Sequence, residues 1–257
     1  TSAEVCPECG VHLPSLLRDV LPAGTLLRTG AYRVDYALGR GGFGITYRGM
    51  HVSLEQTVAI KEFYPQEYAV RESATGTLML PSARSDAYQR ALERFTWEGK
   101  ILAGLNHPGI VRVSDLFEER GTAYLVMDLI TGRTLRNELD IQPDHRLSPI
   151  RVEEIVNQLV NALEAIHQAD VCHLDIKPDN VLVTATGRII LVDFGAARQG
   201  FRGGTAQPFT LEYTAPEILN GQAIGPASDL FELGMMAYEM LTGQRPTGAI
   251  ERLQEDT

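Results

Sequence analysis

Hydrophobic and polar positions alternate along the first half of the chain in a way that predicts strands and one helix. Tyr32, Val34 and Tyr36 are separated by single polar residues, a period of two that is typical of a half-buried strand. Residues 85–106 instead space their apolar side chains as the stripe of an amphipathic helix. Further strands are expected at 45–48, 56–61, 110–117 and 122–130.

From about residue 131 the spacing becomes mainly helical. Residues 149–170 repeat apolar side chains with a period of about 3.6 residues, and 229–241 predict a strongly apolar helix. Two short strands, 180–183 and 188–192, flank a Thr-Gly turn. We therefore expect an α+β fold of two lobes, an antiparallel sheet with one helix followed by a mainly helical lobe. The expected parts are a cysteine-containing knuckle and linker at 1–30, the sheet lobe at 31–130 and the helical lobe at 131–257.

Composition narrows the class of partner. The 257 residues carry a formal charge of −10, which argues against nucleic acid or an anionic membrane surface as the main partner. Three cysteines, Cys6, Cys9 and Cys172, are too few for a disulfide framework and fit a reducing, cytoplasmic compartment. No apolar run approaches the ~18 residues of a membrane helix, so no membrane segment is expected.

The first candidate for chemistry is the glycine-rich stretch from Gly39 to Gly44. Glycines let a backbone approach phosphate groups closely, and successive amides can cradle them. The residues that follow, Ile45 to Arg48, favour a strand, so the stretch is expected to be a hairpin turn rather than the start of a helix. A plain β-turn without a ligand is the alternative interpretation.

The second candidate is Lys61, which ends a predicted buried strand. An ammonium group there can bind phosphate as a point charge, and Glu98 on the predicted helix can hold it through an ion pair. The alternatives are a surface lysine and a solvated helix carboxylate.

The strongest signal is the polar run from His173 to Asn180. Asp175 is suited to accept a proton from a hydroxyl nucleophile, and Lys177 to neutralise a transferring phosphate. Asn180 offers an oxygen of the kind that Mg²⁺ prefers, and Asp193, in Asp-Phe-Gly after an apolar strand, offers a second. Two such loops around a short hairpin indicate phosphoryl transfer.

These motifs, together with Val58-Ala-Ile-Lys61 and Ala215-Pro216-Glu217, resemble the protein kinase family, specifically the Ser/Thr type found in bacteria. The resemblance runs from about residue 32 to 245. It implies the two-lobed kinase fold, ATP and Mg²⁺ as cofactors, and Ser/Thr hydroxyls of protein substrates, including the chain itself, as acceptors.

The resemblance also assigns roles. Lys61 binds the α- and β-phosphates and pairs with Glu98, while Asp175 is the catalytic base and Lys177 steadies the γ-phosphate. The implied Mg²⁺ ligands are Asn180 and Asp193. The implied nucleotide contacts are Leu38, Gly39, Arg40, Gly41, Gly42, Phe43, Gly44, Thr46, Ala59, Lys61, Met127, Asp128, Leu129 and Leu182. Further matches are the apolar stack Leu102, Val113, His173 and Phe194, the loop-bracing Asp229 and the substrate-binding Thr210.

The chain departs from the family pattern at several places. Leu174 replaces the family's Arg that reads a phosphate on the activation segment, which lies between Asp193-Phe-Gly and Ala215-Pro-Glu, so control by phosphorylation there is not expected. Thr46 replaces the usual Val over the adenine. Lys61 and Glu98 are 98 − 61 = 37 positions apart, which leaves room for an added hairpin within 71–85. That insertion is either a docking surface or decorative.

The end of the chain raises a second expectation. The Arg that pairs with the family's Glu217 position is not found after the 229–241 helix, so the helical lobe is expected to be incomplete. A buried Glu217 left unpaired would cost about 3–5 kcal/mol.

Cys6-Pro-Glu-Cys9 supplies two of the four ligands of a zinc site, and His12 is the nearest further ligand. Zn²⁺ binding and an empty knuckle both remain open, since two thiolates alone do not make a structural site. The functional alternatives to a protein kinase are an ATP-binding pseudokinase-like module without activity and a small-molecule kinase.

Overall fold

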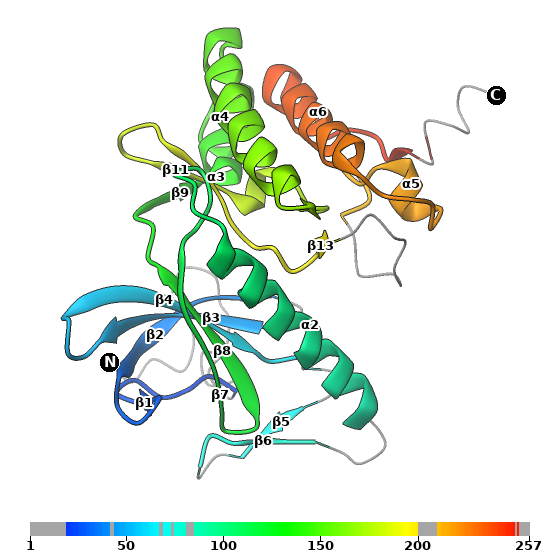
Figure 1. Cartoon of the computed structure of the whole chain (residues 1–257). Coiled ribbons are helices and arrows are strands. Elements are labelled where there is room, and N and C mark those ends of the chain that lie inside the picture. The colour runs from blue at the N-terminus through cyan, green and yellow to red at the C-terminus, as the bar shows by residue number, and fades with distance from the viewer. Residues whose placement is uncertain are drawn as a thin grey trace. The chain divides into compact units, whose positions relative to one another are not determined.

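A computed structural model describes residues 19–41, 44–66, 69–72, 75–80, 85–199, 210–249 and 251. The chain divides into two compact units (Figure 1). The first unit runs to Lys100 and also includes Val113–Leu129. The second unit contains Ile101–Arg112 and everything from Ile130 onward.

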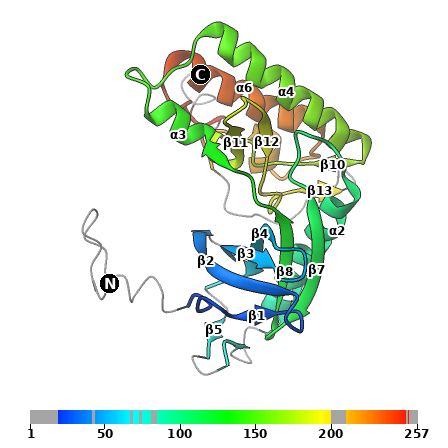
Figure 2. The same cartoon turned by 90° about the vertical axis from the view of Figure 1, so that its left-hand side faces the viewer.

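The first unit is built on a six-stranded antiparallel sheet in the order β1-β2-β3-β4-β8-β7 (Figure 2). Its strands are β1 (Leu26–Leu27), β2 (Tyr32–Gly41), β3 (Gly44–His51), β4 (Gln56–Phe63), β7 (Val113–Glu119) and β8 (Thr122–Asp128). Helix α2 (Ser85–Gly104) packs against this sheet at Gly99, where a Cβ would lie 2.8 Å from the Leu125 side chain. A larger residue at position 99 would force the Leu125 side chain to shift, so glycine allows the helix to lie close to the sheet.

The insertion between β4 and α2 contains the expected hairpin. Strand β5 (Val70–Arg71) pairs with β6 (Leu78–Met79) in antiparallel register. Leu78 N donates to the carbonyl of Arg120 in the β7–β8 turn at 2.9 Å. Because Ala69, Arg71 and Leu78 are all buried, the hairpin is an integral part of the first unit.

The second unit is mainly helical, as the spacing predicts. The helices of this unit are α3 (Leu135–Asp140), α4 (Pro149–Gln168), the 3₁₀ turn η2 (Pro178–Asn180), α5 (Pro216–Leu219) and α6 (Pro226–Thr242). Helix α4 begins at Pro149 because Ser148 caps it by accepting from Arg151 N and Pro149 is favoured in a first turn. Figures 1 and 2 show α4 beside α6. Its strands are β9 (Gly132–Thr134), β10 (Val171–Cys172), β11 (Val181–Thr184), β12 (Ile189–Leu191) and β13 (Arg198–Gln199).

The strand expected at 110–117 begins later, at Val113. The residues before it pair elsewhere: Val111 N donates to Leu191 O, and Leu191 N donates to Gly109 O, both within the second unit. This pairing explains why Ile101–Arg112 belongs with the second unit although Val113–Leu129 does not. None of the described helices combines the length and hydropathy needed to cross a bilayer.

Candidate functional site

The first unit holds the expected pair of Lys61 and Glu98. Lys61 lies on β4 and its Nζ is 3.2 Å from Glu98 Oε1 on α2. The two side chains are 15% and 6% exposed, so the interaction is largely shielded from water. The ammonium also lies 5.9 Å from the centre of the Phe95 ring. Lys61 is therefore not a surface lysine, and Glu98 is not a solvated helix charge.

The glycine stretch lies at the β2–β3 hairpin. Gly39 pairs with Thr46 and Gly41 with Gly44, so the segment is strand–turn–strand, as expected. A Cβ on Gly44 would lie 2.4 Å from the Glu62 carbonyl, which makes glycine necessary for β3 to reach β4. Gly42 and Phe43 lie outside the described residues. Leu38, Gly39, Arg40 and Gly41 are exposed.

The remaining implied nucleotide contacts are divided between the units. Ala59 is buried on β4 and pairs in register with Met127 on β8, and Asp128 and Leu129 follow directly. Leu182 lies in the second unit, half-buried on β11 between Thr134 and Ile190. The structure therefore places each of these residues within its own unit.

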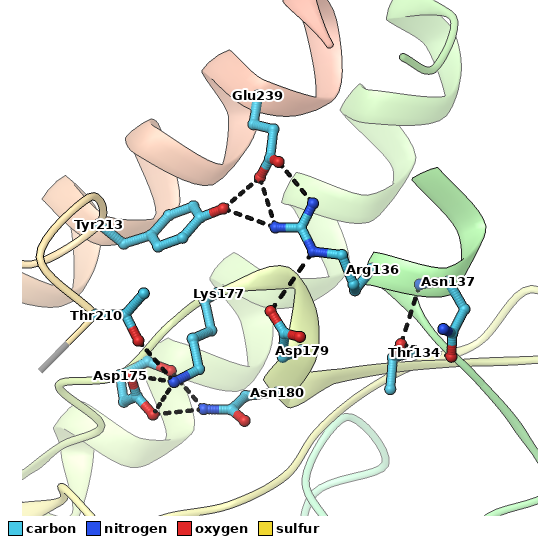
Figure 3. Close-up of polar contacts among 10 residues, drawn as sticks. All are labelled: Thr134, Arg136, Asn137, Asp175, Lys177, Asp179, Asn180, Thr210, Tyr213 and Glu239. Carbon is cyan, nitrogen blue, oxygen red and sulfur yellow. Dashed lines mark hydrogen bonds and ion pairs between the residues drawn. The ribbon is translucent and has the colours of Figure 1, made fainter. Parts of the chain in front are cut away.

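In the second unit three side chains of the catalytic-loop candidate converge (Figure 3). Asn180 Nδ2 donates to Asp175 Oδ2 at 2.7 Å and to the Asp175 carbonyl at 2.9 Å. Lys177 Nζ lies 2.9 Å from the Asp175 carboxylate and donates to Thr210 Oγ1, also at 2.9 Å. Asp175 is half-buried, so its carboxylate is both oriented and accessible.

Two carboxylates of α6 hold the loop that carries Asp175. Asp229 is fully buried and accepts the backbone N–H groups of His173 at 3.0 Å and Leu174 at 2.8 Å. Glu232, one turn along, accepts from Ile176 N at 2.8 Å. Leu174 has a φ of +62°, a left-handed conformation that costs a non-glycine residue energy. The bonds to Asp229 hold the loop in this strained form.

Asp193 follows β12 and is exposed, with a φ of +61°. Gly195 N donates to its carboxylate at 3.4 Å. The next residue, Phe194, is buried against His173 with ring centres 4.6 Å apart in an edge-to-face contact. Burial lowers the pKa of His173, so this imidazole is neutral and acts as a packing residue. These two members of the expected apolar stack are in contact.

The pattern of residues along the chain does not reveal a third group, Arg136, Tyr213 and Glu239. Thr134 caps α3 by accepting from Asn137 N, and this helix start positions Arg136 (Figure 3). Arg136 Nη1 lies 2.7 Å from Glu239 Oε1, and its Nη2 donates to Tyr213 OH at 2.8 Å. Tyr213 OH donates to Glu239 Oε2 at 2.5 Å.

This cluster connects to the candidate loop. Arg136 Nε is 3.6 Å from Asp179 Oδ2, and Asp179 lies between Lys177 and Asn180 in sequence. Burial lowers the pKa of Arg136, but the bond and charge of Glu239 outweigh burial and the pKa is raised overall. The guanidinium therefore stays charged. Its partners are 77 and 103 residues away along the chain, which is why no local signal predicts the cluster.

Leu174 occupies an apolar environment. It is 3% exposed and packs with Cys172 and Ile224, with Ala196 and Ile218 beside them. Leu174 offers no charged group to a phosphate, and the expectation that phosphorylation does not control this loop stays a prediction.

The expectation for Glu217 is wrong. Glu217 is half-buried rather than buried, and it accepts a hydrogen bond from Ser228 Oγ at 2.6 Å. Ser228 belongs to the first turn of α6, so α5 and α6 satisfy the carboxylate locally. The cost of an unpaired buried charge does not apply.

Cys6, Cys9 and His12 lie outside the described residues. Within the described part of the chain, His167, Cys172 and Asp229 bring potential metal-ligand atoms within 4.8 Å of one another. Each of these groups already has a different role. His167 Nε2 bonds Asp229 Oδ2 at 2.7 Å, Asp229 braces the loop, and burial raises the pKa of the Cys172 thiol to about 12. The trio is therefore a structural contact.

Comparison with known proteins gives consistent matches. The family model described as "protein kinase domain" matches residues 32–256. The serine/threonine-protein kinase PknA of Mycobacterium tuberculosis is 34% identical over 232 residues, covering 85% of this chain and 48% of PknA. A probable serine/threonine-protein kinase of Streptomyces coelicolor is 35% identical over 227 residues, covering 84% of this chain and 31% of that protein.

Among solved structures, the PpkA-294 apo form matches with a TM-score of 0.81 and 28% identity, covering 93% of this chain and 84% of that one. The chain spans less than half the length of the two curated relatives.

Proposed function

The chain belongs to the protein kinase family, and from that premise we propose that it transfers the γ-phosphoryl group of ATP to Ser and Thr hydroxyls of protein substrates. The observation that carries the proposal is the convergence of Lys177 and Asn180 on one accessible carboxylate, Asp175, with Thr210 bonded to the same Lys177 ammonium. Transfer to its own Ser and Thr residues is part of the proposal.

The proposed chemistry is an in-line displacement. The substrate hydroxyl oxygen forms a bond to the γ-phosphorus, and the bond from that phosphorus to the β–γ bridging oxygen breaks. ADP leaves with the bridging oxygen, and the hydroxyl proton passes to Asp175. Lys177, already bonded to Asp175 and to Thr210, lies where it can stabilise charge on the moving phosphoryl group.

In the first unit, Lys61 is proposed to bind the nucleotide phosphates. Its ammonium is a point charge suited to the α- and β-phosphates, and Glu98 holds it in place at 3.2 Å. The Gly39–Gly44 hairpin supplies backbone amides for the phosphates of the same nucleotide.

The donor set of the second unit suits Mg²⁺. Asn180 directs its amide nitrogen to Asp175, which leaves its Oδ1 to face a cation, and Asp193 adds a carboxylate. Hard oxygen ligands of this kind favour Mg²⁺ over softer metals. When bound, the ion neutralises charge on the phosphates. For zinc the described residues offer no comparable set of uncommitted ligands.

Leu174 supports a further part of the proposal. Residue 174 is a leucine buried among apolar neighbours, so the loop offers no guanidinium at this position to read a phosphate on the activation segment. We therefore propose that transfer does not depend on phosphorylation of that segment.

The test is phosphate transfer from γ-labelled ATP and Mg²⁺ to a generic basic protein. Asp175→Asn keeps the shape of the side chain and removes the proton acceptor, so the rate should fall about 10²- to 10⁴-fold. Asp144→Asn, at an exposed carboxylate of the same unit, is the matched control and should retain the wild-type rate. Equal rates for wild type and Asp175→Asn would contradict the proposal, and binding of ATP without transfer by folded wild type would favour the pseudokinase-like alternative.

A further inference from the structure

Directly after Lys61, strand β4 carries a carboxylate that the proposed transfer does not use. Glu62 is 0% exposed, and three side chains donate to it. Arg71 Nη2 is 2.6 Å from Oε2, Tyr47 OH is 2.7 Å from the same oxygen, and Tyr124 OH is 2.8 Å from Oε1. Both tyrosines are themselves fully buried.

Arg71 comes from the inserted hairpin, and each of its three nitrogens has a different partner. Besides Nη2 on Glu62, Nε donates to the Asp19 carbonyl at 2.7 Å and Nη1 to the Gly76 carbonyl at 2.8 Å. Its side chain is only 3% exposed. Burial lowers the pKa of Arg71, but Glu62 outweighs burial and the pKa is raised overall, so the guanidinium stays charged.

These contacts join three segments that are distant in sequence. The stretch before β1 contributes two contacts to the cluster: the Asp19 carbonyl accepts from Arg71, and Leu21 N donates to Tyr47 OH at 3.2 Å. The insertion contributes Arg71, and the sheet contributes Glu62, to which Arg71 donates. The planar fork of an arginine is required, because a lysine cannot serve three acceptors in these fixed directions.

The position of Glu62 links this cluster to the site. Consecutive side chains of a strand point to opposite faces of the sheet, so Lys61 and Glu62 face opposite ways. On its own face Lys61 pairs with Glu98 and lies 5.9 Å from the centre of the Phe95 ring, while on the other face Glu62 accepts from three buried donors. Fixing Glu62 therefore fixes the pleat of β4 and the direction in which Lys61 leaves it.

We infer that Arg71 is a positioning residue for Lys61, and that the insertion serves nucleotide binding rather than docking or decoration. This inference rests on the proposed function, since it concerns the lysine proposed to bind the α- and β-phosphates. Arg71 contacts no reacting group. It acts through Glu62 and β4.

The test compares Arg71→Lys with Arg33→Lys, which changes an exposed arginine paired with Asp35 on β2 of the same unit. Steady-state phosphate transfer is measured below the melting temperature of every variant, with ATP and the protein substrate varied separately. For Arg71→Lys we expect the KM for ATP to rise about 3- to 10-fold, with the KM for the protein substrate unchanged. Arg33→Lys should match wild type in both constants.

A purely structural role makes a different prediction. It lowers the melting temperature of Arg71→Lys and leaves the KM for ATP of the folded protein unchanged, and that result would overturn the inference. Should Arg71→Lys not fold, Tyr124→Phe provides the same comparison, because it removes one donor to Glu62 and keeps the ion pair. It is judged by the same rise in the KM for ATP.

Direct binding of ATP and Mg²⁺ separates this inference from the proposed function. If wild-type protein binds ATP and transfers phosphate, and Arg71→Lys binds ATP as tightly as wild type, only this inference is overturned. Wild-type protein that neither binds nor transfers overturns the proposed function and this inference with it.

Discussion

Each unit of the molecule contains a glutamate that accepts from an arginine and from at least one tyrosine hydroxyl, yet the two clusters differ in exposure. In the first unit the Glu62 and Arg71 side chains are 0% and 3% exposed. In the second unit Glu239 and Arg136 are 4% and 13% exposed, and Arg136 also faces Asp179. The cluster of the first unit is therefore shielded from water, and the cluster of the second unit is in contact with the candidate catalytic loop.

The difference indicates what each cluster is for. Arg71 bonds one carboxylate, Glu62, and two backbone carbonyls, so the first cluster holds its three segments in a fixed arrangement. Arg136 has two acidic partners, one on α6 and one beside Asn180. The second cluster therefore connects Tyr213, which lies shortly before α5, to the loop that carries Asp175 and Asp179. Removing a partner should affect stability most in the first unit and substrate handling most in the second.

The largest expected effect is the loss of Arg71. Arg71→Met leaves Glu62 buried without a counter-charge, so the free energy of unfolding should fall by about 3–5 kcal/mol. Denaturant unfolding of the whole chain measures it. The double variant Glu62→Gln/Arg71→Met removes both charges and should recover most of the loss. A loss of less than about 1 kcal/mol in the single variant would show that the pair is not sealed from water.

The next largest effect is expected for Glu239→Gln. It should cost about 1–3 kcal/mol, because Arg136 keeps Asp179 as a partner while Tyr213 loses a charged acceptor. We also expect the KM for the protein substrate to rise and the KM for ATP to stay constant. A rise in the KM for ATP alone would reverse the roles assigned to the two clusters.

A smaller loss of stability is expected when one tyrosine hydroxyl is removed from either cluster. Tyr124→Phe and Tyr213→Phe each remove one hydrogen bond and should cost about 1 kcal/mol. Their kinetic effects should differ: Tyr124→Phe should raise the KM for ATP and Tyr213→Phe the KM for the protein substrate. Identical kinetic profiles for the two variants would remove the distinction between the clusters.

The smallest effect concerns alkaline pH. Burial raises the pKa of Tyr47, Tyr124 and Tyr213 above the ordinary value of 10.0. Above that pH the unfolded chain loses these protons first, so their contribution to stability is intact below pH 10.0 and decreases as pH rises further.

Five of the described tyrosines with raised pKa lie in the first unit, namely Tyr32, Tyr47, Tyr64, Tyr88 and Tyr124, and one, Tyr213, in the second. Limited proteolysis at pH 7 and at about pH 10.5 should therefore show cleavage increasing mainly in the first unit. Replacing the exposed Tyr36 with Phe serves as the control and should change nothing. Cleavage that increases mainly in the second unit would contradict this assignment.

Local patterns predict the elements and the loop chemistry, but they do not predict the two clusters. Lys61 and Glu98 are recognisable because a motif marks the strand and an apolar stripe marks the helix. Asp175 and Asn180 are five residues apart, so their contact follows from one tight turn.

Arg71 and Arg136 carry no such signal. Arg71 reaches Asp19, 52 residues away, and Arg136 reaches Glu239, 103 residues away. Before folding, either arginine resembles a surface charge. Glu217 illustrates the converse: no local pattern marks a partner for it, and only the structure reveals the hydrogen bond that it accepts from Ser228.

The most direct test of the central claim is to identify the product of transfer. Wild-type chain and Asp175→Asn are incubated with ATP, Mg²⁺ and a protein substrate, and mass spectrometry locates the phosphate. We predict phosphoserine and phosphothreonine with wild type and neither above background with Asp175→Asn. Phosphate that is absent with folded wild type, or that forms equally without the Asp175 carboxylate, would contradict the account.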